Sequence, residues 1–279
     1  MVGESYIELR AETGKKPALN DLLTGLLADV GFESFVEEGT ELLAYIREAE
    51  YDAEAVQEVF QAFAPDVAFR IQHIAPQNWN ATWEAQFEPV EVNEHCWIRA
   101  PFHPAKNDGR LEIVIEPRMS FGTGHHATTR LVCKAMYADN WSGLKVLDMG
   151  CGTGVLGILA AKLGAGAVLG IDIEPWAAEN ALENAQQNGV QMECLCGEAS
   201  LLEHQGPFDR ILANINRNIL MEDAHNYRAV LPKGKIYLSG FLSTDIPQIK
   251  EAFHQQGFIL ESQHQEGDWM CLVMRTAEA

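Results

Sequence analysis

The sequence has few basic residues for its length, because 20 Lys and Arg stand against 40 Asp and Glu among 279 residues. It has no apolar run of the ~20 residues that cross a bilayer. Its first residues lack the basic and apolar regions of a secretory signal peptide. None of its six cysteines stands in a Cys-x-x-Cys pair. We therefore expect a cytoplasmic protein with reduced thiols and no membrane segment.

The resulting net charge of −20 bears on the kind of partner. Such a surface repels nucleic acid, so we expect no direct nucleic-acid binding, and it favours a basic partner. The alternative is that the charge serves solubility alone. The excess is concentrated early, since residues 1–70 hold 15 acidic and 5 basic residues, a net charge of −10.

Residues 1–75 alternate in the order β-α-β-β-α-β, which predicts a ferredoxin-like α+β domain. Asn20 is the expected N-cap of a helix over 21–30, and Asp52 is expected to open the second helix. No cluster of catalytic residue types occurs here. We interpret this domain as a module for substrate recognition or scaffolding.

Residues 76–118 are expected to form a structured connector. Trp79, Trp83 and Phe87 follow one another at a spacing of four, which places them on one face of a helix and predicts a packing surface. Short strands are predicted near 96–100 and 111–115.

From Gly143 onward the chain alternates strand and helix, which predicts an α/β domain with a mostly parallel sheet. The last two strands differ, because they are joined by a short polar turn and form an antiparallel hairpin. The predicted strands are 145–149, 167–172, 191–196, 209–214, 234–240, 258–263 and 269–274, and the predicted helices are 154–163, 175–188, 217–230 and 244–256.

The most informative segment runs from Val146 to Gly154. An apolar run leads into Gly150, Gly152 and Gly154, followed by a helical pattern, so the order is strand, tight turn and helix. In open α/β sheets, ligands bind at the carboxyl ends of the strands. Glycine is needed there because a side chain would keep the backbone away from the ligand.

By itself this loop fits two ligand classes. Gly152-x-Gly154-x-x-Gly157 matches the dinucleotide fingerprint of a nicotinamide-dependent oxidoreductase. Asp148 stands directly before the turn, where it opposes a pyrophosphate and favours a ligand with an amino or sulfonium group. Asp172 ends the next strand, where a carboxylate binds ribose hydroxyls; the alternative is a helix cap.

These residues resemble motifs I and II of the class I S-adenosylmethionine-dependent methyltransferases. A more specific resemblance lies upstream, where Phe121-Gly122-Thr123-Gly124-His125-His126-Ala127-Thr128-Thr129 is similar to the Phe-Gly-Thr-Gly-x-His-Pro-Thr-Thr signature of the PrmA family. His125 stands where that family often has Thr, and Ala127 replaces the Pro. That family methylates the eleventh protein of the large ribosomal subunit.

The resemblance implies the fold and the cofactor. It implies a Rossmann-like methyltransferase domain over 119–279 that binds S-adenosylmethionine, behind a ferredoxin-like substrate-recognition domain over 1–75. The cofactor-binding residues that it implies are Phe121, Thr123, Gly124, Asp148, Gly150, Gly152, Gly154, Asp172, Ile173, Glu198 and Asn214.

The resemblance also implies the chemistry and the partner. Asn214 is the candidate catalytic residue, because its side-chain oxygen can accept a hydrogen bond from the attacking amine. The acceptor would be lysine ε-amines or the N-terminal α-amine of the basic ribosomal protein. The adjacent His125 and His126 have no evident third ligand, so we expect no metal. We expect a monomer, and the alternatives are the oxidoreductase and a non-catalytic ribosome-assembly binding module.

Overall fold

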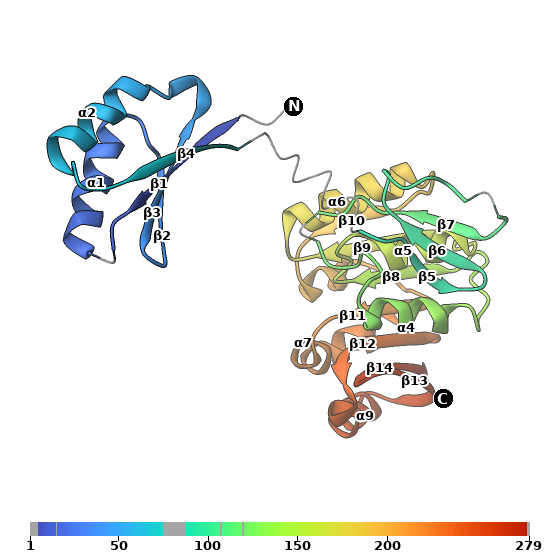
Figure 1. Ribbon diagram of the computed structural model, residues 1–279. Coiled ribbons are helices and arrows are strands. Elements are labelled where there is room, and N and C mark those ends of the chain that lie inside the picture. The colour runs from blue at the N-terminus through green and yellow to red at the C-terminus, as the bar shows by residue number, and fades with distance from the viewer. Residues whose placement is uncertain (1–4, 15, 75–86, 107, 119, 278–279) are drawn as a thin grey trace. The chain divides into compact units, whose positions relative to one another are not determined.

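The computed structural model describes residues 5–14, 16–74, 87–106, 108–118 and 120–277. The chain divides into two compact units, Met1–Phe87 and Glu88–Ala279 (Figure 1). Trp79 and Trp83, expected to pack in the connector, lie outside the described residues. No helix among the described residues is long and apolar enough to span a membrane.

The first unit is a four-stranded antiparallel sheet with two helices, in the strand order β2-β3-β1-β4. This is the ferredoxin-like arrangement, and the prediction is confirmed. The sheet and both helices enclose an apolar core that includes Leu9, Leu27 and Phe60. The elements are β1 (Tyr6–Glu12), α1 (Pro17–Asp29), β2 (Ser34–Glu38), β3 (Glu41–Arg47), the short 3₁₀ helix η1 (Glu48–Glu50), α2 (Ala53–Phe63) and β4 (Phe69–Ile74).

The two helix starts in this unit turn out differently. Asp52 caps α2 as predicted, and its Oδ1 accepts hydrogen bonds from Glu54 N at 2.9 Å and Ala55 N at 3.2 Å. The prediction that Asn20 caps α1 is wrong, because the helix begins at Pro17 and Asn20 is buried inside it. Proline suits the first helical position, since its fixed φ is already helical and it has no N–H to leave unpaired.

The second unit is built on a seven-stranded sheet in the order β10-β9-β8-β11-β12-β14-β13. Its strands are parallel except for β14, which pairs antiparallel with both β12 and β13. The mostly parallel sheet and the antiparallel hairpin are therefore confirmed. The strands are β8 (Lys145–Met149), β9 (Ala167–Asp172), β10 (Glu193–Cys196), β11 (Arg210–Asn214), β12 (Lys235–Leu242), β13 (Phe258–Glu266) and β14 (Trp269–Thr276).

Helices cover both faces of this sheet, and each face has its own apolar core (Figure 1). Trp141 and Ile158 belong to one core, and Tyr227 and Phe253 belong to the other. The helices are α4 (Ala127–Met136), α5 (Val155–Lys162), α6 (Pro175–Gln187), η2 (Ala199–His204), α7 (Arg217–Glu222), α8 (Ala224–Val230), η3 (Ser243–Asp245) and α9 (Ile246–Gln255).

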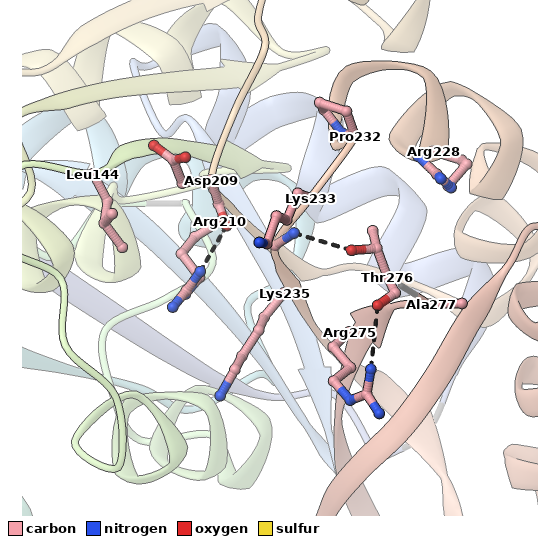
Figure 2. Close-up of a pocket in the computed structure, with 11 residues that line it drawn as sticks. Leu144, Asp209, Arg210, Arg228, Pro232, Lys233, Lys235, Arg275, Thr276 and Ala277 are labelled. Atoms are coloured by element: carbon pink, nitrogen blue, oxygen red, sulfur yellow. Dashed lines mark hydrogen bonds between the residues drawn. The ribbon is translucent and has the colours of Figure 1, made fainter. Parts of the chain in front are cut away.

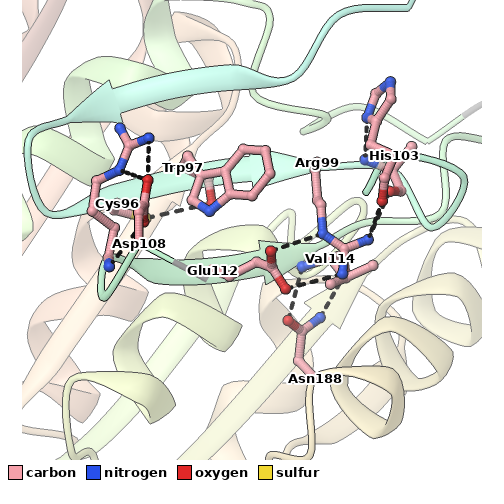
Figure 3. A network of polar contacts seen from close by, with 10 residues as sticks. Cys96, Trp97, Arg99, His103, Asp108, Glu112, Val114 and Asn188 are labelled. Atoms are coloured by element: carbon pink, nitrogen blue, oxygen red, sulfur yellow. Dashed lines mark hydrogen bonds and ion pairs between the residues drawn. The ribbon is translucent and has the colours of Figure 1, made fainter. Parts of the chain in front are cut away.

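A three-stranded sheet of β5 (Val90–Asn93), β6 (Cys96–Arg99) and β7 (Leu111–Val114) belongs to the second unit. Figure 3 shows how Asn188, just after α6, holds β7: Val114 N donates to its Oδ1 at 2.9 Å, and its Nδ2 donates to Val114 O at 2.6 Å. One turn earlier, Asn184 Oδ1 accepts from Glu116 N at 2.9 Å. These bonds hold β7 and the chain after it, as far as Glu116, against the end of α6.

Candidate active site

The glycine loop connects β8 to α5 with three left-handed residues. Gly150, Gly152 and Gly154 have φ values of 70°, 54° and 78°, which L side chains rarely adopt. A Cβ on Gly152 would lie 2.3 Å from the Phe121 carbonyl oxygen. The loop therefore depends on glycine both for its turn and for its close approach to the neighbouring segment.

Asp172 fixes this loop to the end of the adjacent strand β9. Its Oδ2 accepts from Gly152 N at 2.9 Å, and its Oδ1 accepts from Glu174 N at 3.1 Å. Each oxygen keeps capacity for a second hydrogen bond. Among the described residues, the Asp172 side chain accepts no hydrogen bond from the first turn of α6, whose N-cap is Glu174. Ile173, next along the chain, is 62% exposed.

Asp148 lies beneath the loop, with 1% of the residue exposed. Its Oδ2 accepts from Gly157 N at 2.8 Å, inside the first turns of α5. Burial raises the pKa of this carboxyl to about 7; the bond from Gly157 lowers it, and the charge of Asp172 raises it further. Asp148 is therefore buried and bonded to the start of α5. Its place directly before the turn had suggested a carboxylate open to the ligand.

The segment with the sequence signature lies against the outer side of the glycine loop. Thr153 N donates to Phe121 O at 2.9 Å, and Thr153 Oγ1 donates to Gly122 O at 2.8 Å. The Phe121 side chain is 53% exposed. A hollow is lined by this segment, including Thr123 and His125. A ligand resting on the glycine loop would therefore contact residues 121–124 as well.

Arg130 connects this segment to the C-terminal hairpin, a link that no local pattern predicts. Its Nε donates to Glu266 Oε1 at 2.9 Å, and its other nitrogens donate to Glu266, to Gly124 O and to His125 O. The hydrogen bonds from Arg130 and from Lys134 lower the pKa of Glu266. We call Arg130 and Glu266 the hairpin clamp.

A line of aromatic rings reinforces the hairpin clamp. The ring of His126 lies between Phe121 and Trp269, with centroid distances of 5.2 Å and 4.6 Å and edge-to-face geometry in both contacts. The Nδ1 of His126 also caps α4, since it accepts from Thr128 N at 3.3 Å. The turn that joins β13 to β14 is therefore held to the signature segment at both Glu266 and Trp269.

Asn214 ends β11, the strand next to β8. Its Nδ2 lies 3.5 Å from Thr129 Oγ1, while its Oδ1 is buried and has no hydrogen-bond partner among the described residues. A buried acceptor without a partner costs about 1–3 kcal/mol, so such an atom points to a donor supplied by a ligand. The neighbouring Ile215 closes over the loop, because a Cβ on Gly150 would lie 2.1 Å from its Cγ2.

The sheet topology brings the remaining candidates to the same edge. Strands β10, β9, β8 and β11 are parallel neighbours, so Glu198, Asp172, Gly150 and Asn214 follow their carboxyl ends side by side. Gly197 N donates to Asp172 O at 2.8 Å, which places Glu198 beside the second strand, and Glu198 is exposed. The carboxylates at this edge suit a cationic ligand and oppose a pyrophosphate.

The two adjacent histidines have separate partners. His125 Nδ1 lies 3.1 Å from Thr123 Oγ1, and its Nε2 lies 2.9 Å from Glu88 O. In the part of the chain that the structure describes, no group of three or more His, Cys, Asp or Glu is arranged to hold a metal ion. Both histidines contact the signature segment, His125 through Thr123 and His126 through the ring of Phe121.

Comparisons with known proteins agree over nearly the whole chain. The sequence profile of the family described as Ribosomal protein L11 methyltransferase (PrmA) matches residues 22–277. A Ribosomal protein L11 methyltransferase of Porphyromonas gingivalis is 43% identical over 258 residues, 90% of this chain and 89% of its own. One of Chlorobaculum parvum is 36% identical over 281 residues, 97% of this chain and 96% of its own. The crystal structure of the ribosomal protein L11 methylase from Lactobacillus delbrueckii subsp. bulgaricus is similar with a TM-score of 0.63 and 28% identity, covering 69% of this chain and 100% of that one.

Proposed function

This chain belongs to the Ribosomal protein L11 methyltransferase (PrmA) family, and we propose that it transfers methyl groups from S-adenosylmethionine to amines of ribosomal protein L11. The single observation that carries the proposal is the buried Oδ1 of Asn214, which has no hydrogen-bond partner in the described part of the chain. It stands at the end of β11, beside the left-handed glycine loop that follows β8. A donor such as a substrate amine would satisfy this acceptor.

The residues at the strand ends fit S-adenosylmethionine. The glycine loop presents backbone without side chains at this edge, and a Cβ at Gly150 or Gly152 would meet Ile215 or Phe121 O. Asp172 keeps free acceptor capacity for ribose hydroxyls, and the exposed Ile173 offers an apolar surface for adenine. The methionine end would lie toward residues 121–124, and the acidic edge suits its ammonium and sulfonium charges.

When bound, this cofactor supplies a methyl group activated by the positive sulfonium. The amine that receives it must be neutral, whereas a free lysine has a pKa of ~10.4. Desolvation in a pocket beside a cation lowers an amine's pKa. Asn214 Oδ1 would accept one N–H of the amine and orient its lone pair. The hairpin clamp would hold the signature segment, residues 121–129, in place so that it keeps water from the amine.

The acidic first unit supports a basic protein substrate. Residues 1–70 carry a net charge of −10, and exposed glutamates lie along the edge strand β2 at Glu37 and Glu38. Charge of this kind increases the rate of encounter with a basic partner, and the effect weakens as salt is added. We therefore propose that this unit recruits the ribosomal protein.

The test is mass spectrometry of purified L11 after incubation with the enzyme and S-adenosylmethionine. We expect mass gains in steps of about 14 Da, a methyl replacing a hydrogen, with digestion assigning them to lysines or to the N-terminus. Asn214→Ala should lower turnover more than cofactor affinity, because the orienting acceptor is lost. Asn218→Ala, an exposed asparagine four residues on, is the matched control.

The outcomes separate the competing functions. No mass gain under saturating cofactor, with L11 still bound, would favour a non-catalytic ribosome-assembly module. Calorimetric binding of a nicotinamide dinucleotide, with none of S-adenosylhomocysteine, would favour the oxidoreductase. A loss of cofactor affinity in Asn214→Ala with unchanged turnover would make Asn214 a cofactor-binding residue only.

A further inference from the structure

A second hollow, of about 860 Å³, lies at the opposite edge of the seven-stranded sheet (Figure 2). It is formed where β11 and β12 begin and where β14 ends. Its lining includes five cationic side chains, of the chain's 20 Lys and Arg, and one acidic side chain: Arg210, Arg228, Lys233, Lys235, Arg275 and Asp209. Such a concentration of positive charge is unexpected in a protein with a net charge of −20.

Three of these cations form a row across neighbouring strands. Arg210 on β11 pairs in register with Lys235 on β12, and Lys235 pairs with Arg275 on β14. Residues paired in register point to the same face of a sheet, and Figure 2 shows all three side chains extending in the same direction. Like charges directly opposite one another destabilise a sheet, so negative groups beside this row would stabilise it.

The protein's own carboxylates contact only the middle cation of the row, although the charge of Asp139 also acts on Arg210. Lys235 Nζ contacts Asp139 Oδ1 at 2.6 Å and Glu261 Oε1 at 2.5 Å. Arg210 Nη1 and Arg275 Nη1 donate only to backbone oxygens, at 2.9 Å and 3.5 Å. The Nε of Arg210 is buried and has no partner among the described residues.

The other two cations of the hollow are also without an acidic partner. Arg228 Nη1 donates to Leu231 O at 3.2 Å, and Lys233 is exposed. Across the described residues, neither forms an ion pair with a carboxylate, and the same holds for Arg210 and Arg275. The lining Asp209 is engaged elsewhere, since its Oδ2 accepts from Lys145 N at 2.8 Å. Four cations of the hollow therefore have N–H donors that no carboxylate of the described residues accepts.

We propose that this hollow binds a small anion with two or more phosphate groups. Guanidinium groups match phosphate oxygens with paired N–H donors, and one phosphate would leave most of the four cations unneutralised. The lining contains no aromatic side chain on which a base could stack. A net charge of −20 opposes a long nucleic acid. The site is independent of the proposed methyl transfer, because it occupies the other edge of the sheet.

The test is a calorimetric titration of the full-length protein with tripolyphosphate at about 150 mM salt, where weak surface attraction is screened. We expect saturable binding that is weakened at least tenfold in Lys233→Gln/Arg275→Gln. Lys106→Gln/Lys250→Gln changes the net charge equally at two residues of the second unit that do not line the hollow, and should bind as the wild type does. If the double variant fails to fold, Lys233→Gln alone changes an exposed residue and should still weaken binding.

Several results would overturn the proposal. Absence of saturable tripolyphosphate binding would do so, as would equal weakening in the control variant. Tighter binding of a 20-nucleotide RNA than of tripolyphosphate would identify a nucleic-acid surface instead. A parallel titration with ATP distinguishes the source of the phosphates: affinity equal to that of tripolyphosphate shows that the phosphates alone are recognised, and higher affinity adds a nucleoside contact.

Discussion

Asp148 makes the stability of the second unit depend on pH, and Asp148→Asn tests this. The carboxyl is 1% exposed, and burial raises its pKa to about 7. An unfolded chain would show ~3.9. Between these values the folded state holds a proton that the unfolded state has lost, so the free energy of unfolding falls as pH rises. The stabilisation is complete below the unfolded value and is lost as pH passes about 7.

The size of the effect follows from the two pKa values. A difference of one pKa unit corresponds to ~1.36 kcal/mol, so the full difference is about 4 kcal/mol as an order of magnitude. From pH 5 to pH 8 the wild type should lose ~3 kcal/mol through this group. An asparagine keeps an oxygen for the bond from Gly157 N but does not titrate. Asp148→Asn should therefore remove that part of the pH dependence.

The assay is urea unfolding at pH 5, 6, 7 and 8, followed by tryptophan fluorescence. Trp97, Trp141, Trp176 and Trp269 all lie in the second unit, so the signal reports mainly on that unit. Glu179→Gln, which removes an exposed carboxylate from α6, is the control. The reasoning is refuted if the stability difference between Asp148→Asn and the wild type changes by less than ~0.5 kcal/mol across this range.

Three further substitutions test the loop. Gly152→Ala should abolish S-adenosylhomocysteine binding while the chain stays folded, because its Cβ would meet Phe121 O at 2.3 Å; wild-type affinity by calorimetry would contradict the close approach. Asp172→Ala should weaken the same ligand by ~1–3 kcal/mol, since a hydrogen-bonding partner is lost, and unchanged affinity would exclude the ribose role. Glu266→Gln should raise the KM for S-adenosylmethionine several-fold with a smaller change in kcat, because Arg130 loses its charged partner; an effect on kcat alone would argue against a positioning role.

Local patterns were sufficient to predict most of the second unit. Strands β8 and β9 begin and end where predicted, since each is an apolar run followed by glycine or a polar turn. The start of α1 was missed, because Asn20 has the chemistry of a cap while Pro17 determines the start. Pro17 and Asn20 both favour a helix start at their own position. The burial of Asn20 inside the helix shows that α1 starts at Pro17.

The direction of Asp148 could not be read from the sequence for a physical reason. Helices cover both faces of this sheet, so β8 is buried at Val146, Leu147, Asp148 and Met149 alike. Without an alternation of apolar and polar residues, the pattern does not show which face a side chain joins. The sequence therefore identified a carboxylate at the turn, and only the structure shows that it lies beneath the loop.

Contacts between residues far apart in the sequence could not be predicted from it either. Arg130 and Glu266 are separated by 136 positions, and Arg210, Lys235 and Arg275 are aligned only by strand register. A shift of one residue in either pairing would send alternate side chains to the opposite face. The hairpin clamp and the basic row are therefore consequences of tertiary pairing, which the order of elements alone does not specify.

The strand topology also explains why the two edges of the sheet differ in charge. The carboxyl ends of β9 and β10 bring Asp172 and the exposed Glu198 together, where the proposed cofactor is cationic. The amino ends of β11 and β12 bring Arg210 and Lys235 together at the other edge. Because the rigid sheet separates these edges, a phosphate anion and a cationic cofactor would not compete for the same charges. Binding at one edge should consequently leave the affinity at the other unchanged unless the strands themselves move.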